Sequence, residues 1–200
     1  MENNWKIYFI RHWQTNRNLI NQMNPWDVDS ELNETWLKQA LEAWKKAKKD
    51  WMIFDIIISS PLKRALNTAE IIWRETWYEW EILTDDRLKE QFAWVFKDYN
   101  HDQLEKEFNA PETEKRRIIF KSKRYNKKED IIEFYNRVTE IYKEIENKYS
   151  WKKVLIVWHT GVSRILFINS QDIDFYTAVY QMKSTPNWII IDLSKKIEKV

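Results

Sequence analysis

The stretch that decides the fold of this 200-residue chain is Ile7–Ile10 followed by Arg11-His12-Trp13-Gln14-Thr15. Apolar residues that end in polar side chains are typical of a buried strand. Such a strand delivers its last residues to the carboxyl edge of a sheet, where open α/β sheets keep their ligand sites. Arginine there holds a phosphoryl group with two hydrogen bonds, and a neutral imidazole beside it attacks phosphorus in line. The stretch therefore predicts a nucleophile beside a phosphate clamp.

The composition describes one folded domain, residues 1–200, without a strong electrostatic preference. The 33 basic and 31 acidic residues leave a net charge of +2, so no global field recruits nucleic acid or a membrane. The chain has no cysteine, which excludes disulfides, thiol catalysis and thiolate metal sites. Because no signal region precedes the first strand and no stretch approaches 18 consecutive apolar residues, we expect a cytoplasmic protein.

Apolar runs alternate with segments of helical period along the chain. This βαβα order implies a three-layer α/β sandwich, with a mostly parallel sheet and helices on both faces. The polar, helical segment at about residues 97–150 is expected to be an insertion. The expected strands are Lys6–Arg11, Phe54–Ser60, Glu81–Leu83, Lys153–Val157 and Trp188–Leu193, and the expected helices are Asn33–Lys49, Leu62–Arg74 and Gly161–Asn169.

Four motifs that follow expected strands resemble those of a known family. Arg11–Thr15 with Asn18 resembles the Arg-His-Gly-(Glu/Gln)-Thr-x-x-Asn signature of the histidine phosphatase superfamily, which has the phosphoglycerate mutase-like fold. Ser59–Ala69 is similar to the family's Ser-Ser-x-Leu-x-Arg-Ala-x-x-Thr-Ala, and Leu88–Glu90 to its Leu-x-Glu. Val157–Arg164 looks like its second-histidine segment. The resemblance covers most of the chain and implies the family's fold and chemistry.

The resemblance also implies a role for individual residues. Phosphoryl transfer needs in-line geometry and neutralisation of the equatorial oxygens, which two arginines and a protonatable histidine around one nucleophile supply without a metal or a cofactor. The implied catalytic residues are His12 as nucleophile, Arg11, Arg64 and His159 as transition-state stabilisers and Glu90 as acid and base, and the implied phosphate-binding residues are Arg11, Asn18, Arg64, His159 and Thr160.

Ordinary structural roles compete with these assignments. A lone histidine at a strand end is more often a hydrogen-bonded structural residue. A catalytic role for His12 is favoured only because the other motifs occur in the same chain. Glu90 is the least distinctive residue, because Glu81, Asp85 and Asp86 lie nearby and a surface carboxylate is the default. Asn18 fits an Asx turn equally well.

One feature departs from the family pattern: tryptophan stands where glycine is expected. Trp13 takes the glycine position of the first motif, and Trp36, Trp94 and Trp188 are further examples. The chain has one glycine and 13 tryptophans, whereas average usage is about 7% glycine, or roughly 14 in this length. We interpret this as exchange of glycine for tryptophan. If residue 13 needs a positive φ, its indole adds strain, and it points either into the phosphate pocket or against neighbouring loops.

A basic run in the insertion has two interpretations. The resemblance implies that the helical insertion covers the active site. The basic run is then either part of a lid that meets a polyanionic substrate or a solvated helix face, and the acidic residues that flank it favour the solvated face. Its basic residues are Lys115, Arg116, Arg117, Lys121, Lys123, Arg124, Lys127 and Lys128.

Three functions fit these observations. The first is a phosphomonoester hydrolase that acts on a small phosphorylated metabolite through a phosphohistidine. The second is a 2,3-bisphosphoglycerate-dependent phosphoglycerate mutase, which shares every catalytic residue. The third is an inactive binding module in which Trp13 fills the phosphate site. Neither nucleic acid nor a membrane is an expected partner, and a homodimer is left open.

Overall fold

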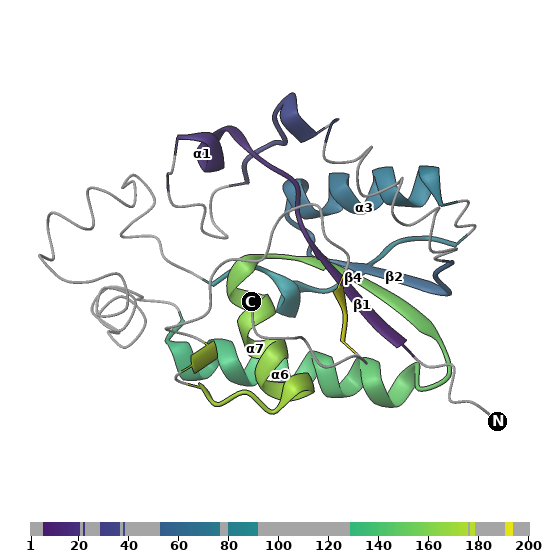
Figure 1. Ribbon diagram of the computed structural model, residues 1–200, viewed down its shortest axis with the longest axis vertical. Coiled ribbons are helices and arrows are strands. Elements are labelled where there is room, and N and C mark those ends of the chain that lie inside the picture. The colour runs from purple at the N-terminus through teal and green to yellow at the C-terminus, as the bar shows by residue number, and fades with distance from the viewer. Residues whose placement is uncertain are drawn as a thin grey trace, which may run out of the picture.

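Five strands form one sheet in the computed structural model of the chain (Figure 1). The structure describes residues 6–20, 22, 29–36, 38, 53–76, 80–91, 129–175, 177–178 and 191–193. The strand order is β3-β2-β4-β1-β5, in which β5 alone pairs antiparallel, at the edge. The strands are β1 (Lys6–Arg11), β2 (Ile56–Ser59), β3 (Leu83–Thr84), β4 (Lys153–Trp158) and β5 (Ile191–Asp192).

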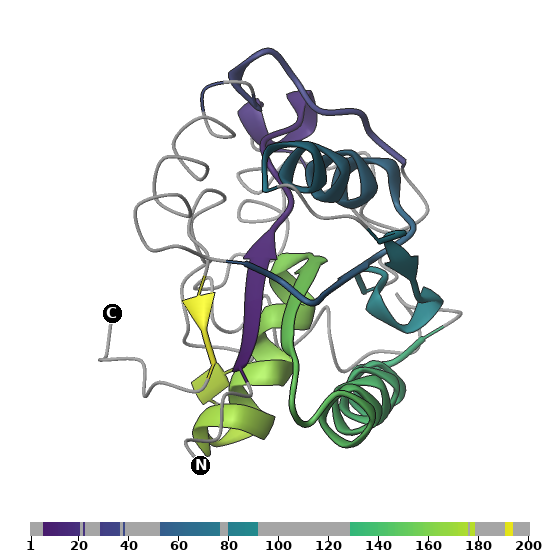
Figure 2. The ribbon, with the colours of Figure 1, turned by 90° about the vertical axis from the view of Figure 1, so that its right-hand side faces the viewer.

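Helices cover both faces of this sheet. One face carries α3 and the other carries α6 and α7, as the views in Figures 1 and 2 show. The central strands are apolar on both faces, which is what a parallel sheet between two helical layers requires. The remaining elements are short turns of helix near the strand ends. The helices are α1 (Asn16–Leu19), α3 (Lys63–Glu75), η1 (Asp86–Leu88), α6 (Ile131–Lys148) and α7 (Thr160–Gln171).

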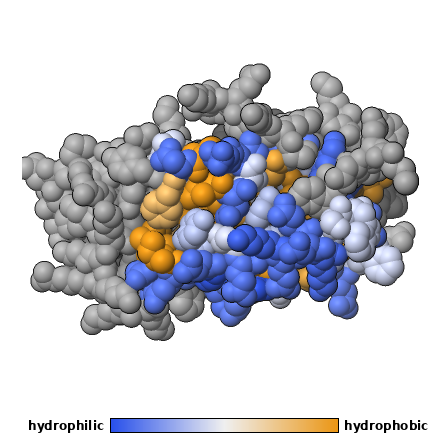
Figure 3. All heavy atoms as spheres, turned by 90° about the horizontal axis from the view of Figure 1, so that it is seen from below, coloured by the Kyte–Doolittle hydropathy of each residue, from blue (hydrophilic) through white to orange (hydrophobic). Residues whose placement is uncertain are grey.

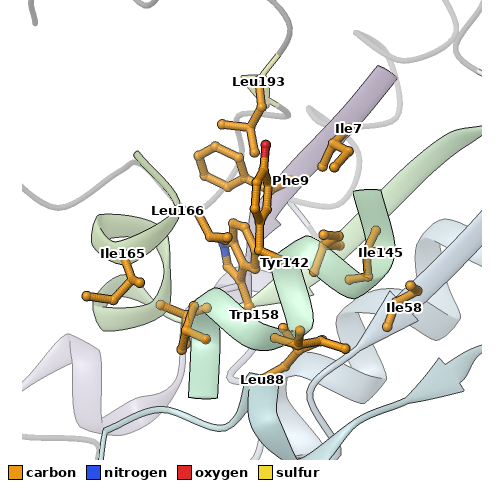
Figure 4. Packing of buried hydrophobic residues seen from close by; sticks show 14 of the residues in the cluster. Ile7, Phe9, Ile58, Leu88, Tyr142, Ile145, Trp158, Ile165, Leu166 and Leu193 are labelled. Carbon is orange, nitrogen blue, oxygen red and sulfur yellow. The ribbon is translucent and has the colours of Figure 1, made fainter. Parts of the chain in front are cut away.

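Strand alternation divides the core into two clusters. On β1, Ile7 and Phe9 face α6 and α7, whereas Tyr8 and Ile10 face α3, because successive side chains point to opposite faces. Figure 4 shows the α6 and α7 cluster. Its members include Ile58, Leu88, Phe134, Val138, Tyr142, Ile145, Val154, Ile156, Trp158, Ile165, Leu166 and Leu193; the α3 cluster adds Trp13, Phe54, Ile57, Ala65, Ala69, Ile72, Leu155 and Val157.

Helix α6 is fixed at its start and amphipathic along its length. The Asp130 carboxylate accepts from the backbone N–H groups of Ile132 and Glu133, and the Glu133 side chain accepts from the Asp130 N–H, which is a capping box. Figure 3 shows the molecule from below the view of Figure 1, the side on which α6 lies, and the described surface there is mostly hydrophilic. The helix therefore buries one stripe on the sheet and presents charged residues to solvent.

Most predicted elements are present with small shifts in their ends. β1 and α3 match their predicted ranges within one residue, β4 gains Trp158, and β2 is shorter than predicted. Of the insertion predicted at about residues 97–150, the structure describes only 129–150, and there α6 forms part of the core. The basic run at 115–128 and most of the predicted helix at 33–49 lie outside the described residues.

Helix α6 provides a matched test of this packing. Ile145 is 2% exposed and Ile132 is 55% exposed on the same helix. We expect Ile145→Ala to lower the free energy of unfolding by about 2–5 kcal/mol, because it removes buried methyl groups and leaves a cavity. Ile132→Ala should change it by no more than about 0.5 kcal/mol. Urea unfolding of both variants measures the difference, and similar losses would contradict the assignment of the buried stripe.

Candidate active site

The pairing of β1 with β4 sets two histidines side by side. The parallel register ends at the pair Arg11 and Trp158, and the His12 N–H continues it by donating to the Trp158 carbonyl at 2.8 Å. The next residue on each strand is therefore a histidine. The rings of His12 and His159 have centroids 5.1 Å apart, and the residues are 3% and 0% exposed. Two residues 147 positions apart in sequence thus meet at one sheet edge.

A backbone carbonyl fixes the tautomer of His12. Its Nδ1 lies 2.7 Å from the carbonyl oxygen of Trp13. Because a carbonyl can only accept, Nδ1 carries the proton and donates it. In the neutral ring this leaves the lone pair on Nε2, so Nε2 is the nitrogen that can act as a nucleophile.

Two arginines provide the positive charge of the site. Arg64 lies in the first turn of α3 and is fully buried, and Arg11 at the end of β1 is partly buried. Burial lowers the pKa of Arg64 to about 10, and the Glu90 carboxylate opposes this change. Burial likewise lowers the pKa of Arg11, again opposed by Glu90. Both guanidinium groups remain cationic at neutral pH, as a phosphate clamp requires.

These charges keep the two histidines neutral. Burial, followed by the nearby Arg64 and Arg11, lowers the pKa of His12 well below 6.5. Burial and Arg64 act first on His159 as well, and its pKa is also well below 6.5. A neutral His12 is what a nucleophile needs. The sequence predicts a protonatable group at His159, whereas burial and the two arginine cations keep it neutral in the structure.

Ser60 is a site residue to which the sequence analysis assigns no role. Its hydroxyl lies 2.8 Å from His159 Nε2, and both residues are fully buried. Ser60 follows β2, so the third of the adjacent parallel strands also contributes to this edge. The Ser-Ser pair in the motif is the signal that points to it. This contact fixes the orientation of the His159 ring.

Glu90 reaches the same edge from the loop after η1. Both of its carboxylate oxygens accept from the backbone N–H of Gly161, each at 3.1 Å, and Oε1 also accepts from the N–H of Gln91 at 2.9 Å. Gly161 lies in the first turn of α7, where backbone N–H groups favour an anion. A Cβ at this glycine would lie 2.3 Å from Glu90 Oε1. The one glycine of the chain thus stands where the backbone approaches a carboxylate.

The other acidic residues near Glu90 in the sequence form ion pairs of their own or are exposed. Asp85 caps η1 and forms an ion pair with Arg87 at 2.8 Å. Asp86 is exposed and pairs with Lys89 at 2.9 Å. Glu81 is exposed. Among these candidates only Glu90 acts on the pKa of both Arg11 and Arg64, so it is the acid that shares the site with the arginines.

The predicted phosphate contacts of Asn18 and Thr160 have a structural context. Asn18 Oδ1 accepts from the backbone and side chain of Thr15, at 3.1 and 2.9 Å, in a capping box that starts α1. Only the Nδ2 group of Asn18 is thus suited to a phosphate contact. Thr160 is the first residue of α7, next to His159. Both contacts stay predictions.

The indole of Trp13 packs in the apolar cluster under α3. It is 1% exposed, stacks on Trp36 with centroids 6.5 Å apart, and its backbone N–H donates to Thr68 at 3.1 Å. Among the described residues other than glycine, only Asp172 has a positive φ. Residue 13 therefore does not meet the condition under which strain is predicted. Of the two predicted directions for the indole, the structure has the ring packed against neighbouring residues, in the α3 cluster and on Trp36.

Comparison with known proteins identifies the family. The model described as "Histidine phosphatase superfamily (branch 1)" matches residues 7–192, which include β1 from Ile7 onward, β2, β4 and every site residue above. The chain belongs to the histidine phosphatase superfamily. Phosphoglycerate mutase-like protein 4 of Arabidopsis thaliana is 29% identical over 167 residues, which cover 81% of this chain and 69% of that protein.

Other known proteins share parts of the sequence or the fold. The 2,3-bisphosphoglycerate-dependent phosphoglycerate mutase of Lactococcus lactis is 41% identical over 66 residues, 33% of this chain and 28% of that enzyme. A solved mycobacterial glucosyl-3-phosphoglycerate phosphatase superposes with a TM-score of 0.75 at 20% identity, covering 94% of this chain and 88% of that one. The phosphoglycerate mutase-like α/β fold is thereby established. None of the described helices is long and apolar enough to cross a membrane.

The buried neutral histidines predict a pH dependence of stability. Their pKa values are below 6.5 in the folded chain and near 6.5 when unfolded, so the unfolded chain binds more protons in slightly acidic solution. The free energy of unfolding should have its full value above about pH 6.5. At lower pH it should decrease by up to about 1.4 kcal/mol per pH unit for each histidine. Urea unfolding between pH 5 and 7 measures this slope, and His12→Asn with His159→Asn should flatten it. An unchanged slope in that double variant would contradict the assignment.

Proposed function

We propose that this protein is a metal-independent phosphomonoester hydrolase that forms a phosphohistidine on His12 Nε2. The observation that carries the proposal is the hydrogen bond from His12 Nδ1 to the Trp13 carbonyl, which leaves the lone pair of a neutral ring on Nε2. The buried Arg64 and its neighbour Arg11 supply charge for the three equatorial oxygens of a transferring phosphoryl group. Membership of the histidine phosphatase superfamily supports the same chemistry.

In the first step the lone pair of His12 Nε2 attacks phosphorus, and the bond from phosphorus to the ester oxygen breaks. Arg11 and Arg64 neutralise the developing charge, and His159 donates a hydrogen bond to it. The Glu90 carboxylate takes up the proton of a phosphomonoester that binds as its monoanion and passes it to the leaving oxygen, which departs as an alcohol.

In the second step a water molecule attacks the phosphohistidine. Glu90, now a carboxylate, takes a proton from the water, and the bond between phosphorus and Nε2 breaks. Inorganic phosphate leaves and His12 returns to its neutral form. The residue that acts as acid in the first step therefore acts as base in the second.

The mutase similarity defines a second candidate. The segment shared with the Lactococcus lactis mutase favours phosphoglycerate mutase activity, in which the phosphoryl group passes to a second hydroxyl group rather than to water. We favour the hydrolase because the similarity to that mutase covers only 33% of this chain. Release of inorganic phosphate, compared with transfer between 2- and 3-phosphoglycerate, separates the two activities. Absence of both activities would contradict the proposal.

The phosphoenzyme provides the direct test of His12. We expect ³²P-labelled substrate to leave an acid-labile, base-stable label on the parent chain, because phosphohistidine has that lability. His12→Ala should remove both label and turnover, whereas His159→Ala should slow turnover and keep some label. Label that persists in the His12 variant would assign the nucleophile to another residue.

The role of Glu90 predicts a dependence on the leaving group. Glu90→Gln should lower kcat on the order of 10²-fold or more for alkyl phosphates, which need a proton on the leaving oxygen, and much less for activated aryl phosphates. Steady-state kinetics on both substrates measure the contrast. Asp86→Asn, on the same loop but exposed, is the matched control and should leave both rates near those of the parent. Equal losses on both substrates in the Glu90 variant would remove Glu90 from this role.

A further inference from the structure

The guanidinium group of Arg137 holds the backbone of the loop that carries Glu90. Arg137 lies in α6, and its Nη1 donates to the carbonyl oxygens of Arg87 at 2.6 Å and Lys89 at 2.9 Å. Its Nη2 donates to the carbonyl oxygen of Glu90 at 3.3 Å. Three carbonyls within four residues thus converge on one side chain.

The rest of the same guanidinium group is held by Glu129. Nε donates to Glu129 Oε1, and Nη2 donates to Oε2 at 2.9 Å. An arginine has five N–H donors, and these five hydrogen bonds use all of them. The Phe134 ring lies 4.7 Å below the guanidinium carbon, and the side chains of Arg137 and Glu129 are 21% and 13% exposed. The group is therefore fixed in position and direction.

This arrangement locates the Glu90 carboxylate from two sides. Arg137 holds the main chain of Glu90, and the Gly161 N–H holds its carboxylate. Since η1 ends at Leu88, the carbonyls that follow it have no helical ladder to bind. Glu129 stands immediately before α6, at the other end of the segment that begins after Gln91. One guanidinium group thus links residues 87–90 to Glu129, which come before and after the segment 92–128 in the sequence.

We propose that Arg137, oriented by Glu129, is a positioning residue that sets the Glu90 carboxylate for proton transfer. It acts through the loop backbone. The proposal rests on the proposed function, in which Glu90 is the acid and base. A planar fork is needed to reach three carbonyls and a carboxylate together, so lysine does not replace it.

A neighbouring arginine offers a matched control. Arg87 also joins this loop to α6, through ion pairs with Glu140 at 2.8 Å and Glu144 at 2.7 Å. These partners are exposed side chains rather than loop carbonyls. Arg87→Met and Arg137→Met remove the same charge between the same two elements, and only Arg137→Met removes the bonds to the Glu90 backbone.

The first measurement needs no enzymatic activity. Because the chain has one glycine, labelling with ¹⁵N-glycine, with unlabelled serine supplied, gives one glycine amide signal, that of Gly161, which donates to Glu90. We expect Arg137→Met to move this signal and raise its exchange with water on the order of 10-fold, toward the value of Glu90→Ala. Glu129→Gln should shift it in the same direction, and Arg87→Met should leave it near the parent position. An unchanged Gly161 signal in folded Arg137→Met would overturn the proposal.

The second measurement uses turnover. Arg137→Met and Arg137→Lys should lower kcat for alkyl phosphates on the order of 10- to 100-fold, since a small displacement of a catalytic group has effects of that size, and should lower it much less for activated aryl phosphates. KM should change little. Arg87→Met should show no such contrast, and the same contrast in Arg87→Met would overturn the proposal as general loosening. If the parent chain has no turnover, the proposed function fails and the Gly161 signal alone decides the position of Glu90.

Discussion

The parallel register between β1 and β4 is the constraint on which the rest of the site depends. It places Arg11 opposite Trp158, and the hydrogen bond from the His12 N–H to the Trp158 carbonyl extends the ladder by one step. A shift of one residue would turn the apolar residues of β1 to the opposite layers and separate the two histidines. The packing of Ile7 and Phe9 against α6 and α7 therefore protects the geometry of the catalytic edge.

Charge balance within a buried space is the second organising feature. Two guanidinium groups and two neutral histidines share one edge, and the negative charge of Glu90 acts on the pKa of both arginines. Burial makes each unpaired charge costly. In the proposed function a phosphoryl group would offer more negative charge to the same donors. Arg137 holds the loop of Glu90 through its backbone carbonyls, so the Glu90 carboxylate can still exchange its hydrogen-bond partners.

The tryptophans illustrate how packing accommodates an unusual composition. Trp13 and Trp158 are buried in different apolar clusters, on opposite sides of the sheet. Neither indole Nε1 has a hydrogen-bond partner among the residues that the structure describes, although buried tryptophans ordinarily find one. Their surroundings therefore supply contact area without a polar partner. The interpretation that tryptophan stands in place of glycine stays a prediction.

The sequence by itself determined the family, the order of strands and helices, and the residue types of the site, because strand periodicity and strand-end motifs are local signals. The β1 and α3 predictions needed little change, and Arg64 and His159 could be assigned from their motifs. Only the tertiary structure decided which nitrogen of His12 is free, that Ser60 meets His159, that Trp13 packs under α3, and that Arg137 reaches the Glu90 loop. These depend on hydrogen bonds between residues brought together by folding, and the Arg137 contacts span about 50 positions of sequence, for which no local pattern exists.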